Sequence, residues 1–404
     1  MIKTAYYQDL TKMNTFGMKV KARCFMEYDS VADLVDIEFE ELARPVLHIG
    51  GGSNLLFTDD FKGTVLHSKI DFIEILDECQ CVPETPSHSV GPSPYPEVGK
   101  CLLHTNGTSS GTSKLLVSVG SGVVFDDFCE WAAKEGLWGV ENLSYIPGEV
   151  GASAVQNIGA YGVEVKDVIH KVYCYDTLEE EFVSFSVEEC GYGYRDSIFK
   201  KPEVKGRYIV THVVFALSRK PQPKLDYGHL RDAVVNVASL SGEPRLSADR
   251  HPQAEGGMSL PSDTTFAPTP AQIRKAIIKI RKEKLPEPSV KGSAGSFFKN
   301  PVISAEHFAK IEAAAKAELG PDYKVPHYDL PEGTVKVPAA WMIEQCGWKG
   351  KRSGGAAVWD KQPLVIVNYT GEAYPEEIIG LEKRIIASVK QKFDIVLHPE
   401  VEHI

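Results

Sequence analysis

The sequence predicts an α+β protein of two or three domains, and three observations lead to this prediction. The chain has 404 residues, more than one hydrophobic core usually organises. Hydrophobic residues make up 43% of it and charged residues 25%, as in folded globular proteins. Strand-like and helix-like segments are mixed without strict alternation, which is not the pattern of a doubly wound parallel sheet.

The amino-terminal part of the chain predicts a compact α/β region. Apolar residues at helical spacing predict a helix over residues 30–43, and Pro45 ends it. Residues 46–49 (VLHI) predict a short strand that runs directly into three consecutive glycines. Apolar runs at 55–57 and 64–67 predict further strands after these glycines.

Two later segments have no sustained periodicity. Residues 78–113 and 238–268 are rich in Pro, Ser and Gly, and each predicts a loose insertion. The elements predicted around these insertions are a strand at 115–119, helices at 125–134, 271–284, 304–317 and 375–392, and a final strand at 394–397.

Charge and composition exclude several classes of protein. The net charge of −11 argues against a general nucleic-acid binder, which needs a positive face. No segment approaches the roughly 18 apolar residues of a membrane helix, and the first ten residues lack the apolar core of a secretory signal. The eight cysteines do not have the spacing of a zinc site, so we expect free thiols and no metal. A cytoplasmic protein is expected.

The three glycines at 50–52 are followed by Ser53 and Asn54. A dinucleotide-binding turn of the Rossmann type would place its third glycine where Leu55 stands and would open into a helix, but the following residues have strand and turn character. Two interpretations remain. One is a turn whose bare N–H groups hold phosphate oxygens, and the other is a hairpin turn without a ligand.

A second block rich in small residues, LSYIPGEVGASAVQNIGAYGV at 143–163, favours the ligand interpretation. Few cores need so many small residues in so short a span, whereas a flat, polar ligand lying against bare backbone does. Two such blocks indicate one dinucleotide held between two subdomains. The candidate cofactor-binding residues are Gly50, Gly51, Gly52, Ser53, Asn54, Pro147, Gly148, Gly151, Ala152, Ser153, Gln156, Asn157, Gly159, Ala160, Tyr161 and Gly162.

Six motifs, taken in order along the chain, resemble those of a known family. They are GGGSNLLF (50–57), ENLSYIPGEVGASAVQNIGAYGVE (141–164), YGYRDSIFK (192–200), GSAGSFFKNP (292–301), GGAAVW (354–359) and HPEV (398–401). This set is similar to that of the UDP-N-acetylenolpyruvoylglucosamine reductase (MurB) family of bacterial cell-wall synthesis. The resemblance covers the chain apart from the two insertions.

The resemblance implies an FAD-binding fold of two α/β subdomains, non-Rossmann and PCMH/VAO-like, plus a C-terminal α+β substrate-binding domain. The implied domains are residues 1–72, with 393–404 returning to them, then 73–218 and 219–392. Non-covalent FAD would take hydride from NADPH and reduce UDP-N-acetylglucosamine enolpyruvate to UDP-N-acetylmuramate for peptidoglycan synthesis. The protein would be a cytoplasmic monomer with no nucleic-acid or membrane partner.

The reaction has chemical needs that three residues would meet. Hydride addition to C3 of an enolpyruvyl group pushes charge toward its carboxylate, and C2 then needs a proton. By the resemblance, Arg195 would hold the growing charge, Ser296 would donate the proton and Glu400 would assist at the enol. Without the motifs, structural explanations would be favoured: an ion pair with Asp196 or another acid for Arg195, a turn or helix cap for Ser296, and a solvated surface carboxylate for Glu400.

The resemblance also places substrate contacts at Tyr227, Lys284, Asn300 and Gln362, with Tyr227 in the loop of the subclass whose tyrosine covers the substrate. For Lys284, a favourable position at a helix C-terminus is a sufficient alternative explanation. Two other functions remain open: another FAD-dependent oxidase or dehydrogenase of the same superfamily, with His48 as a covalent flavin ligand, and a non-catalytic nucleotide-binding protein.

Overall fold

The computed structural model describes residues 1–76, 114–240 and 267–404. The insertion predicted at 78–113 lies outside the described residues. Residues 241–266 of the insertion predicted at 238–268 also lie outside them. Contacts divide the chain into two compact units. The first unit comprises Met1–Lys3, Glu27–Glu41 and His67–Ile280, and the second comprises Thr4–Met26, Leu42–Leu66 and Arg281–Ile404.

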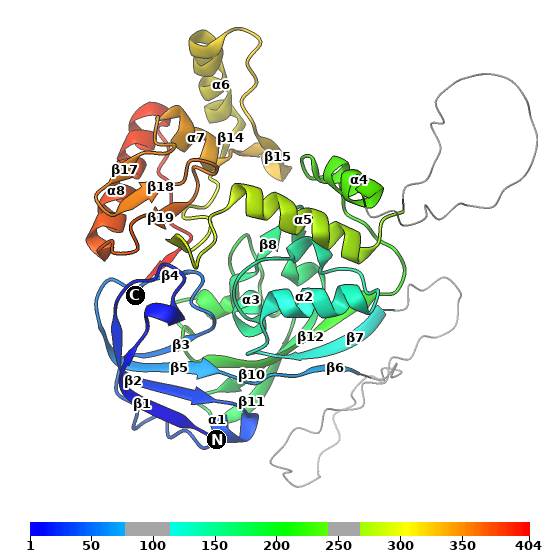
Figure 1. Ribbon diagram of the computed structural model, residues 1–404, viewed down its shortest axis with the longest axis vertical. Helices are drawn as coiled ribbons and strands as arrows, with labels where there is room; N and C mark the ends of the chain where they lie inside the picture. The colour runs from blue at the N-terminus through cyan, green and yellow to red at the C-terminus, as the bar shows by residue number, and fades with distance from the viewer. Residues whose placement is uncertain (77–113, 241–266) are drawn as a thin grey trace, which may run out of the picture. The chain divides into compact units, whose positions relative to one another are not determined.

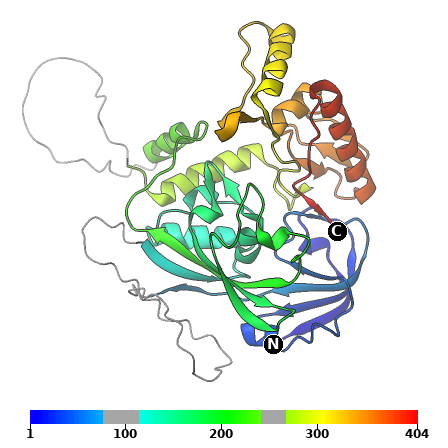
Figure 2. The ribbon, with the colours of Figure 1, turned by 180° about the vertical axis from the view of Figure 1, so that it is seen from behind.

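The first unit is built on a five-stranded antiparallel sheet with the order β11-β10-β12-β7-β6 (Figure 1). Figure 2 shows this sheet from behind. The elements of this unit are α1 (Val31–Val35), β6 (Ile73–Ile75), β7 (Lys114–Gly120), α2 (Phe125–Lys134), η2 (Glu141–Leu143), α3 (Val150–Gln156), β8 (Gly159–Ala160), β9 (Val163–Glu164), η3 (Val165–Asp167), β10 (Ile169–Asp176), β11 (Glu181–Ser186), η4 (Ile198–Lys200), β12 (Tyr208–Ser218), α4 (Leu230–Leu240) and most of α5 (Pro270–Lys284).

Helix α2 follows the prediction for residues 125–134 because its buried positions recur at helical spacing. Phe125, Phe128, Cys129 and Ala132 are all buried. The Phe128 ring lies 4.7 Å from that of Phe215 on β12, which packs the helix on the sheet. The predicted strand at 115–119 is confirmed as β7.

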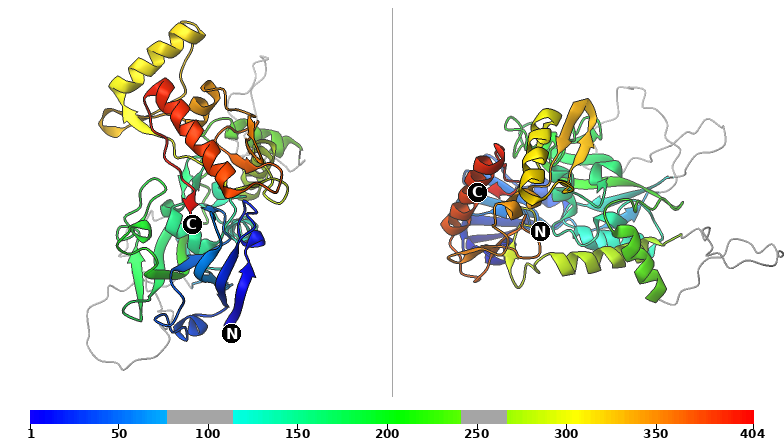
Figure 3. Two further views of the ribbon diagram at one scale, coloured as in Figure 1. Left: turned by 90° about the vertical axis from the view of Figure 1, so that its left-hand side faces the viewer. Right: turned by 90° about the horizontal axis from the view of Figure 1, so that it is seen from above.

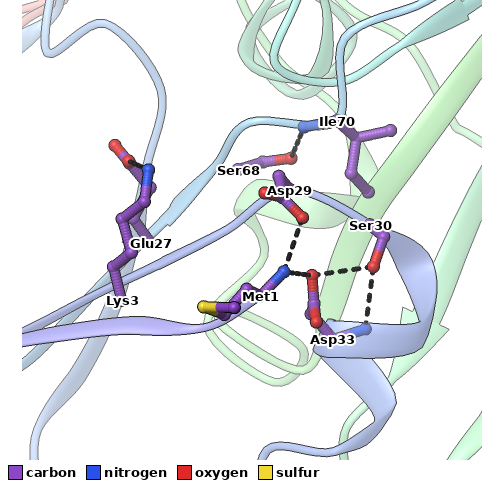
Figure 4. Close-up of polar contacts among 8 residues, drawn as sticks. All are labelled: Met1, Lys3, Glu27, Asp29, Ser30, Asp33, Ser68 and Ile70. Atoms are coloured by element: carbon purple, nitrogen blue, oxygen red, sulfur yellow. Dashed lines mark hydrogen bonds and ion pairs between the residues drawn. The ribbon is translucent and has the colours of Figure 1, made fainter.

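Helix α1 corrects the longer helix predicted at 30–43. It spans only Val31–Val35, and Ser30 caps it by accepting a hydrogen bond from the Asp33 N–H at 3.1 Å. Figure 4 shows this cap and the Met1 amino group, which binds the carboxylates of Asp29 and Asp33. The acidic residues from Asp36 onward fall where the helix dipole disfavours negative charge, so apolar spacing alone overestimated the length.

The second unit contains two four-stranded sheets, β1-β2-β5-β3 and β13-β19-β18-β17, together with a three-stranded sheet and the parallel pair β20-β4. Strands β1, β2 and β5 each continue into residues assigned to the first unit. Its elements are β1 (Lys3–Asp9), η1 (Thr11–Met13), β2 (Lys21–Tyr28), β3 (Val46–Ile49), β4 (Leu55–Leu56), β5 (Phe61–Ser68), β13 (Gly292–Ser293), β14 (Val302–Ser304), α6 (Ala305–Leu319), β15 (Tyr328–Leu330), η5 (Pro331–Gly333), β16 (Thr334–Lys336), α7 (Ala339–Gln345), β17 (Arg352–Ser353), β18 (Ala356–Val358), β19 (Ile366–Asn368), α8 (Pro375–Phe393) and β20 (Glu402–His403).

Helix α8 illustrates how the sequence specifies this unit. Pro375 occupies the first helical position, and Tyr374 and Glu377 form a reciprocal cap. Its buried positions include Ile378, Leu381, Ile385 and Val389. The helix, red in Figure 3, contacts β18 and β19. The helices predicted at 271–284, 304–317 and 375–392 are confirmed within a few residues.

The strand predicted at 394–397 is wrong. Ile395 and Leu397 are buried and Val396 is 44% exposed, so the alternation is real, but no strand among the described residues pairs with this segment. Both buried side chains belong to the main core cluster of the second unit. Alternating burial therefore reflects packing of an extended segment rather than a sheet.

Candidate active site

The glycine turn at 50–54 lies in the second unit between β3 and β4. Gly52 has φ +60°, and a Cβ atom there would lie 2.0 Å from the Met13 carbonyl oxygen. The Thr15 N–H donates to the Gly52 carbonyl at 3.1 Å. Gly52 is therefore required by close packing of the chain on itself. Sequence reasoning weighed a phosphate-holding turn against a hairpin turn without a ligand, but it did not consider this close approach to residue 13.

The same turn is tied to the C-terminal segment. The Asn54 side-chain NH₂ donates to the Glu400 carbonyl at 3.1 Å, and the Glu402 N–H donates to the Asn54 carbonyl at 2.9 Å. Asn54 therefore lies beside residues 400–402, which come 346 or more positions later in the chain.

The second glycine-rich block, residues 143–163, lies in the first unit and contains α3. The Gly148 carbonyl and the Val150 and Gly151 N–H groups all bond to the turn formed by residues 121–125, at 2.9 to 3.0 Å. A Cβ on Gly151 would lie 2.8 Å from the Ser121 Cβ. Small residues in this block therefore serve tight internal packing as well as any ligand.

One buried group in this block fits a bound cofactor. The Gln156 oxygen accepts from the Lys200 ammonium at 2.6 Å. The Gln156 nitrogen is buried and has no hydrogen-bond partner within the described residues. An unsatisfied buried donor costs about 1–3 kcal/mol, and an acceptor on a ligand would remove that cost. Asn157 has positive φ because it is the left-handed C-cap of α3, and the Asn157 and Ile158 N–H groups donate back to carbonyls of that helix.

Arg195 stands over this block within the first unit. Its guanidinium donates to the carbonyls of Asn157 at 3.2 Å and Gly159 at 2.5 Å, and its own φ is +55°. Asp196, the alternative ion-pair partner considered above, pairs with Lys201 at 2.9 Å. The structure thus brings Arg195 together with Asn157 and Gly159 of the predicted cofactor residues.

Ser296 and Glu400 lie in paired segments of the second unit. The Glu400 N–H donates to the Phe297 carbonyl at 2.8 Å, and the Lys299 N–H donates to the His398 carbonyl at 2.9 Å. Ser296 is exposed and Glu400 is half-buried. Two residues that are 104 positions apart (400 − 296) therefore belong to adjoining backbone segments, whereas Arg195 belongs to the first unit.

The predicted substrate residues are divided between the units. Tyr227 lies in the first unit, and its ring makes an edge contact with that of Tyr161 at 6.0 Å. In the second unit, the Asn300 side-chain oxygen accepts from the Ala339 N–H at 2.9 Å, so part of this side chain has a structural role. The Lys284 carbonyl accepts from the Trp359 indole at 3.0 Å, and the Gln362 carbonyl accepts from the Val365 N–H at 3.0 Å.

Asn142 is a functional candidate that sequence reasoning missed. Its buried side-chain NH₂ donates to the carbonyls of Tyr161 and Lys224, both at 2.9 Å. One amide therefore fixes the Tyr161 turn and the segment that leads to Tyr227. The only sequence signal was its place inside the 141–164 motif, because neither of its partners is near it in the chain.

A buried polar cluster supports the beginning of α3 in the first unit. His67 Nε2 lies 3.0 Å from Glu149 Oε1, and Nδ1 lies 3.3 Å from Glu27 Oε2. His67 and Glu149 are both buried, and Glu149 immediately precedes α3. No motif signalled this cluster, because its members come from three separate segments.

The described part of the chain contains no group of three or more His, Cys, Asp or Glu side chains able to hold a metal ion. None of its helices has the length and apolar character of a membrane span. The cysteines described are free thiols, namely Cys24, Cys129, Cys174, Cys190 and Cys346.

The chain matches known proteins along most of its length. Residues 287–404 match the family model for the C-terminal domain of UDP-N-acetylenolpyruvoylglucosamine reductase, and residues 87–181 match that of an FAD-binding domain. A reductase of this name from Bacteroides fragilis is 43% identical over 396 residues, covering 98% of each chain. One from Porphyromonas gingivalis is 39% identical over 398 residues, covering 98% of this chain and 97% of the other.

A solved structure also resembles the whole chain. The MurB reductase of Thermus caldophilus superposes with a TM-score of 0.56 and 20% identity, covering 100% of this chain and 98% of the other. At this identity the likeness concerns the fold, which is the α+β FAD-binding type predicted from the sequence.

Proposed function

Because this chain belongs to the UDP-N-acetylenolpyruvoylglucosamine reductase family, we propose that its glycine-rich blocks bind FAD and that Arg195, Ser296 and Glu400 carry out the chemistry. The activity is the NADPH-dependent reduction of UDP-N-acetylglucosamine enolpyruvate to UDP-N-acetylmuramate, a step of peptidoglycan synthesis. The observation that carries this conclusion is the 43% identity over 98% of both chains. Another oxidase or dehydrogenase of the superfamily is not favoured.

The cofactor site would draw on the sixteen candidate residues of the two blocks, of which Gln156 has the clearest structural support. FAD held there would supply the hydride chemistry that side chains lack, between NADPH and the enolpyruvyl double bond. The chain's own contribution would be the Gln156 amide, whose buried nitrogen has no hydrogen-bond partner within the described residues. This part of the proposal predicts a yellow protein whose flavin is released by denaturation.

Arg195 would bind the carboxylate of the enolpyruvyl group. Its guanidinium is held by two main-chain carbonyls, so its direction is fixed before substrate arrives. A fixed cation aimed at developing charge is typically worth about 3 kcal/mol in the transition state. We expect Arg195→Lys to lower the rate because an ammonium cannot bind a carboxylate by two parallel bonds.

Ser296 would donate the proton to C2, and Glu400 would stabilise the enol or assist the proton transfer. A serine hydroxyl is a weak acid, so this role needs a strongly basic carbon placed directly beside it. The pairing of the Phe297–Lys299 and His398–Glu400 backbones supports the idea that both side chains serve one site. Tyr227, Lys284, Asn300 and Gln362 would bind the sugar nucleotide, Asn300 through its NH₂ because its oxygen accepts from Ala339.

The division into residues 1–72 with 393–404, 73–218 and 219–392 remains our proposal for the domains. The parallel pairing of β20 with β4 supports the return of the C-terminal residues to the first of them. We further propose a cytoplasmic monomer without nucleic-acid or membrane partners.

An anaerobic two-step experiment tests the assignment of Ser296. The FAD-loaded protein is reduced with one equivalent of NADPH, and the enolpyruvyl sugar nucleotide is then added while the flavin absorbance is followed. Ser296→Ala should leave the first step nearly unchanged and slow the second by about 10² or more. Ser289→Ala, an exposed serine a few residues earlier, is the control. Equal slowing of both steps would refute the role of Ser296.

A further inference from the structure

Lys200 connects two parts of the proposed site within the first unit. It is the last residue of η4 and belongs to the YGYRDSIFK motif. Its ammonium donates to the Gln156 side-chain oxygen at 2.6 Å and to the Arg195 carbonyl at 3.0 Å. One cation therefore contacts both a proposed cofactor ligand and the proposed catalytic arginine.

The contact with Gln156 decides which end of the amide is free for a ligand. An ammonium has only donors, so it must face the oxygen of the amide and never the NH₂. The NH₂ consequently points away from Lys200, where its nitrogen is buried and lacks a hydrogen-bond partner among the described residues. A ligand that satisfies this group must present an acceptor atom.

The contact with Arg195 concerns the backbone. Arg195 has φ +55°, a left-handed conformation that side chains rarely adopt and that surrounding contacts must hold. The Lys200 ammonium binds the carbonyl of this residue, while the Arg195 guanidinium binds the carbonyl of Asn157, the residue after Gln156. Gln156, Asn157, Arg195 and Lys200 thus form a closed ring of contacts.

We propose that Lys200 is a positioning residue that turns the Gln156 amide into a hydrogen-bond donor toward FAD and holds the main chain of Arg195. This inference rests on the proposed function, because it assumes that FAD lies at the 147–162 block. It adds that cofactor affinity and the placement of the arginine depend on the same ammonium.

The primary test is the affinity of the apoprotein for FAD, measured by quenching of flavin fluorescence. Lys200→Met should weaken FAD binding about tenfold, which corresponds to the loss of one hydrogen bond. Lys200→Arg should restore most of the affinity, because a guanidinium also has only donors. Lys201→Met is the matched control, since it removes the same charge from a half-exposed neighbour paired with Asp196, and it should bind FAD as the wild type does.

Variants of Gln156 separate positioning from folding. Gln156→Glu keeps an acceptor for Lys200 but has no NH₂, so FAD binding should weaken about tenfold while the melting temperature of the apoprotein is maintained. In a Gln156→Leu background, Lys200→Met should cause no additional loss of FAD affinity, because the group that it orients is already gone.

Three outcomes would overturn the proposal: wild-type FAD affinity in Lys200→Met, wild-type affinity in Gln156→Glu, or losses that simply add in the double variant. These outcomes differ from a failure of the proposed function itself. In that case the wild-type apoprotein would not bind FAD, and both proposals would fall together.

Discussion

His212 on β12 makes the stability of the first unit sensitive to acid. Its ring stacks on that of Tyr173 at 4.3 Å with an angle of 12°, and the Phe72 ring lies 6.1 Å away. Burial among these rings lowers the pKa of His212 from 6.5 to about 4. The difference corresponds to about 3 kcal/mol of unfolding free energy, at 1.36 kcal/mol for each tenfold change in proton affinity.

The direction of the effect follows from which state binds the proton more tightly. The pKa is lower in the folded protein, so the unfolded chain binds the proton better. The stabilisation is therefore complete above pH 6.5 and is lost as the pH falls toward 4. Carboxylates titrate in part of the same range, which makes a comparison with a variant necessary.

The assay is urea unfolding of the FAD-saturated protein between pH 7 and pH 4. His212→Gln should lose about 3 kcal/mol less than the wild type over this range. His229→Gln is the control, because that side chain is 98% exposed and should leave the profile unchanged. Proton NMR gives an independent readout, since one histidine signal that is absent from His212→Gln should titrate near pH 4. A signal titrating near 6.5, or identical profiles for the wild type and His212→Gln, would refute the reasoning.

Three further predictions concern residues around the site. Asn142→Ala removes two buried hydrogen bonds, so urea denaturation should give an unfolding free energy lower by about 2 kcal/mol. Because the segment that leads to Tyr227 is then held less firmly, steady-state kinetics should show that KM for the sugar nucleotide rises more than kcat falls. His67→Leu leaves the buried Glu149 without this partner, and denaturation should show a loss of about 3 kcal/mol, whereas an unchanged midpoint would contradict that pairing. Gly52→Ala introduces a Cβ into a 2.0 Å gap at positive φ, so calorimetry should find a lower melting temperature and titration a weaker affinity for FAD.

Much of the fold could be predicted from periodicity because its helices bury one face. The helices at 125–134 and 375–392 were recognised from apolar spacing and end signals that the structure retains. The two failures differ in cause. The helix predicted at 30–43 ends at Val35 because acidic residues follow from Asp36 onward. At 394–397 the apolar alternation is real, but it reflects side-chain burial by distant residues, so backbone hydrogen bonds could not be inferred from it.

The site residues that could be predicted differ from those that were missed in how local their sequence signal is. Arg195, Ser296 and Glu400 were identified because each stands in a motif of local sequence. Lys200, Asn142 and the His67 cluster were missed because their roles depend on partners brought close only by folding. The Gln156 nitrogen, which has no hydrogen-bond partner in the part of the chain that the structure describes, could not be identified from sequence either, because a sequence does not tell which end of an amide is used.

The bonds between residues 54–58 and the last few residues bear on how the chain is synthesised. Asn54 and Thr58 each bond to a residue 346 positions later, at Glu400 and Ile404. At roughly 5–20 residues per second, a ribosome needs on the order of tens of seconds to make that intervening stretch. During this interval β4 lacks its partner β20, so the turn at 50–54 should reach its final packing only after residues 400–404 have been synthesised.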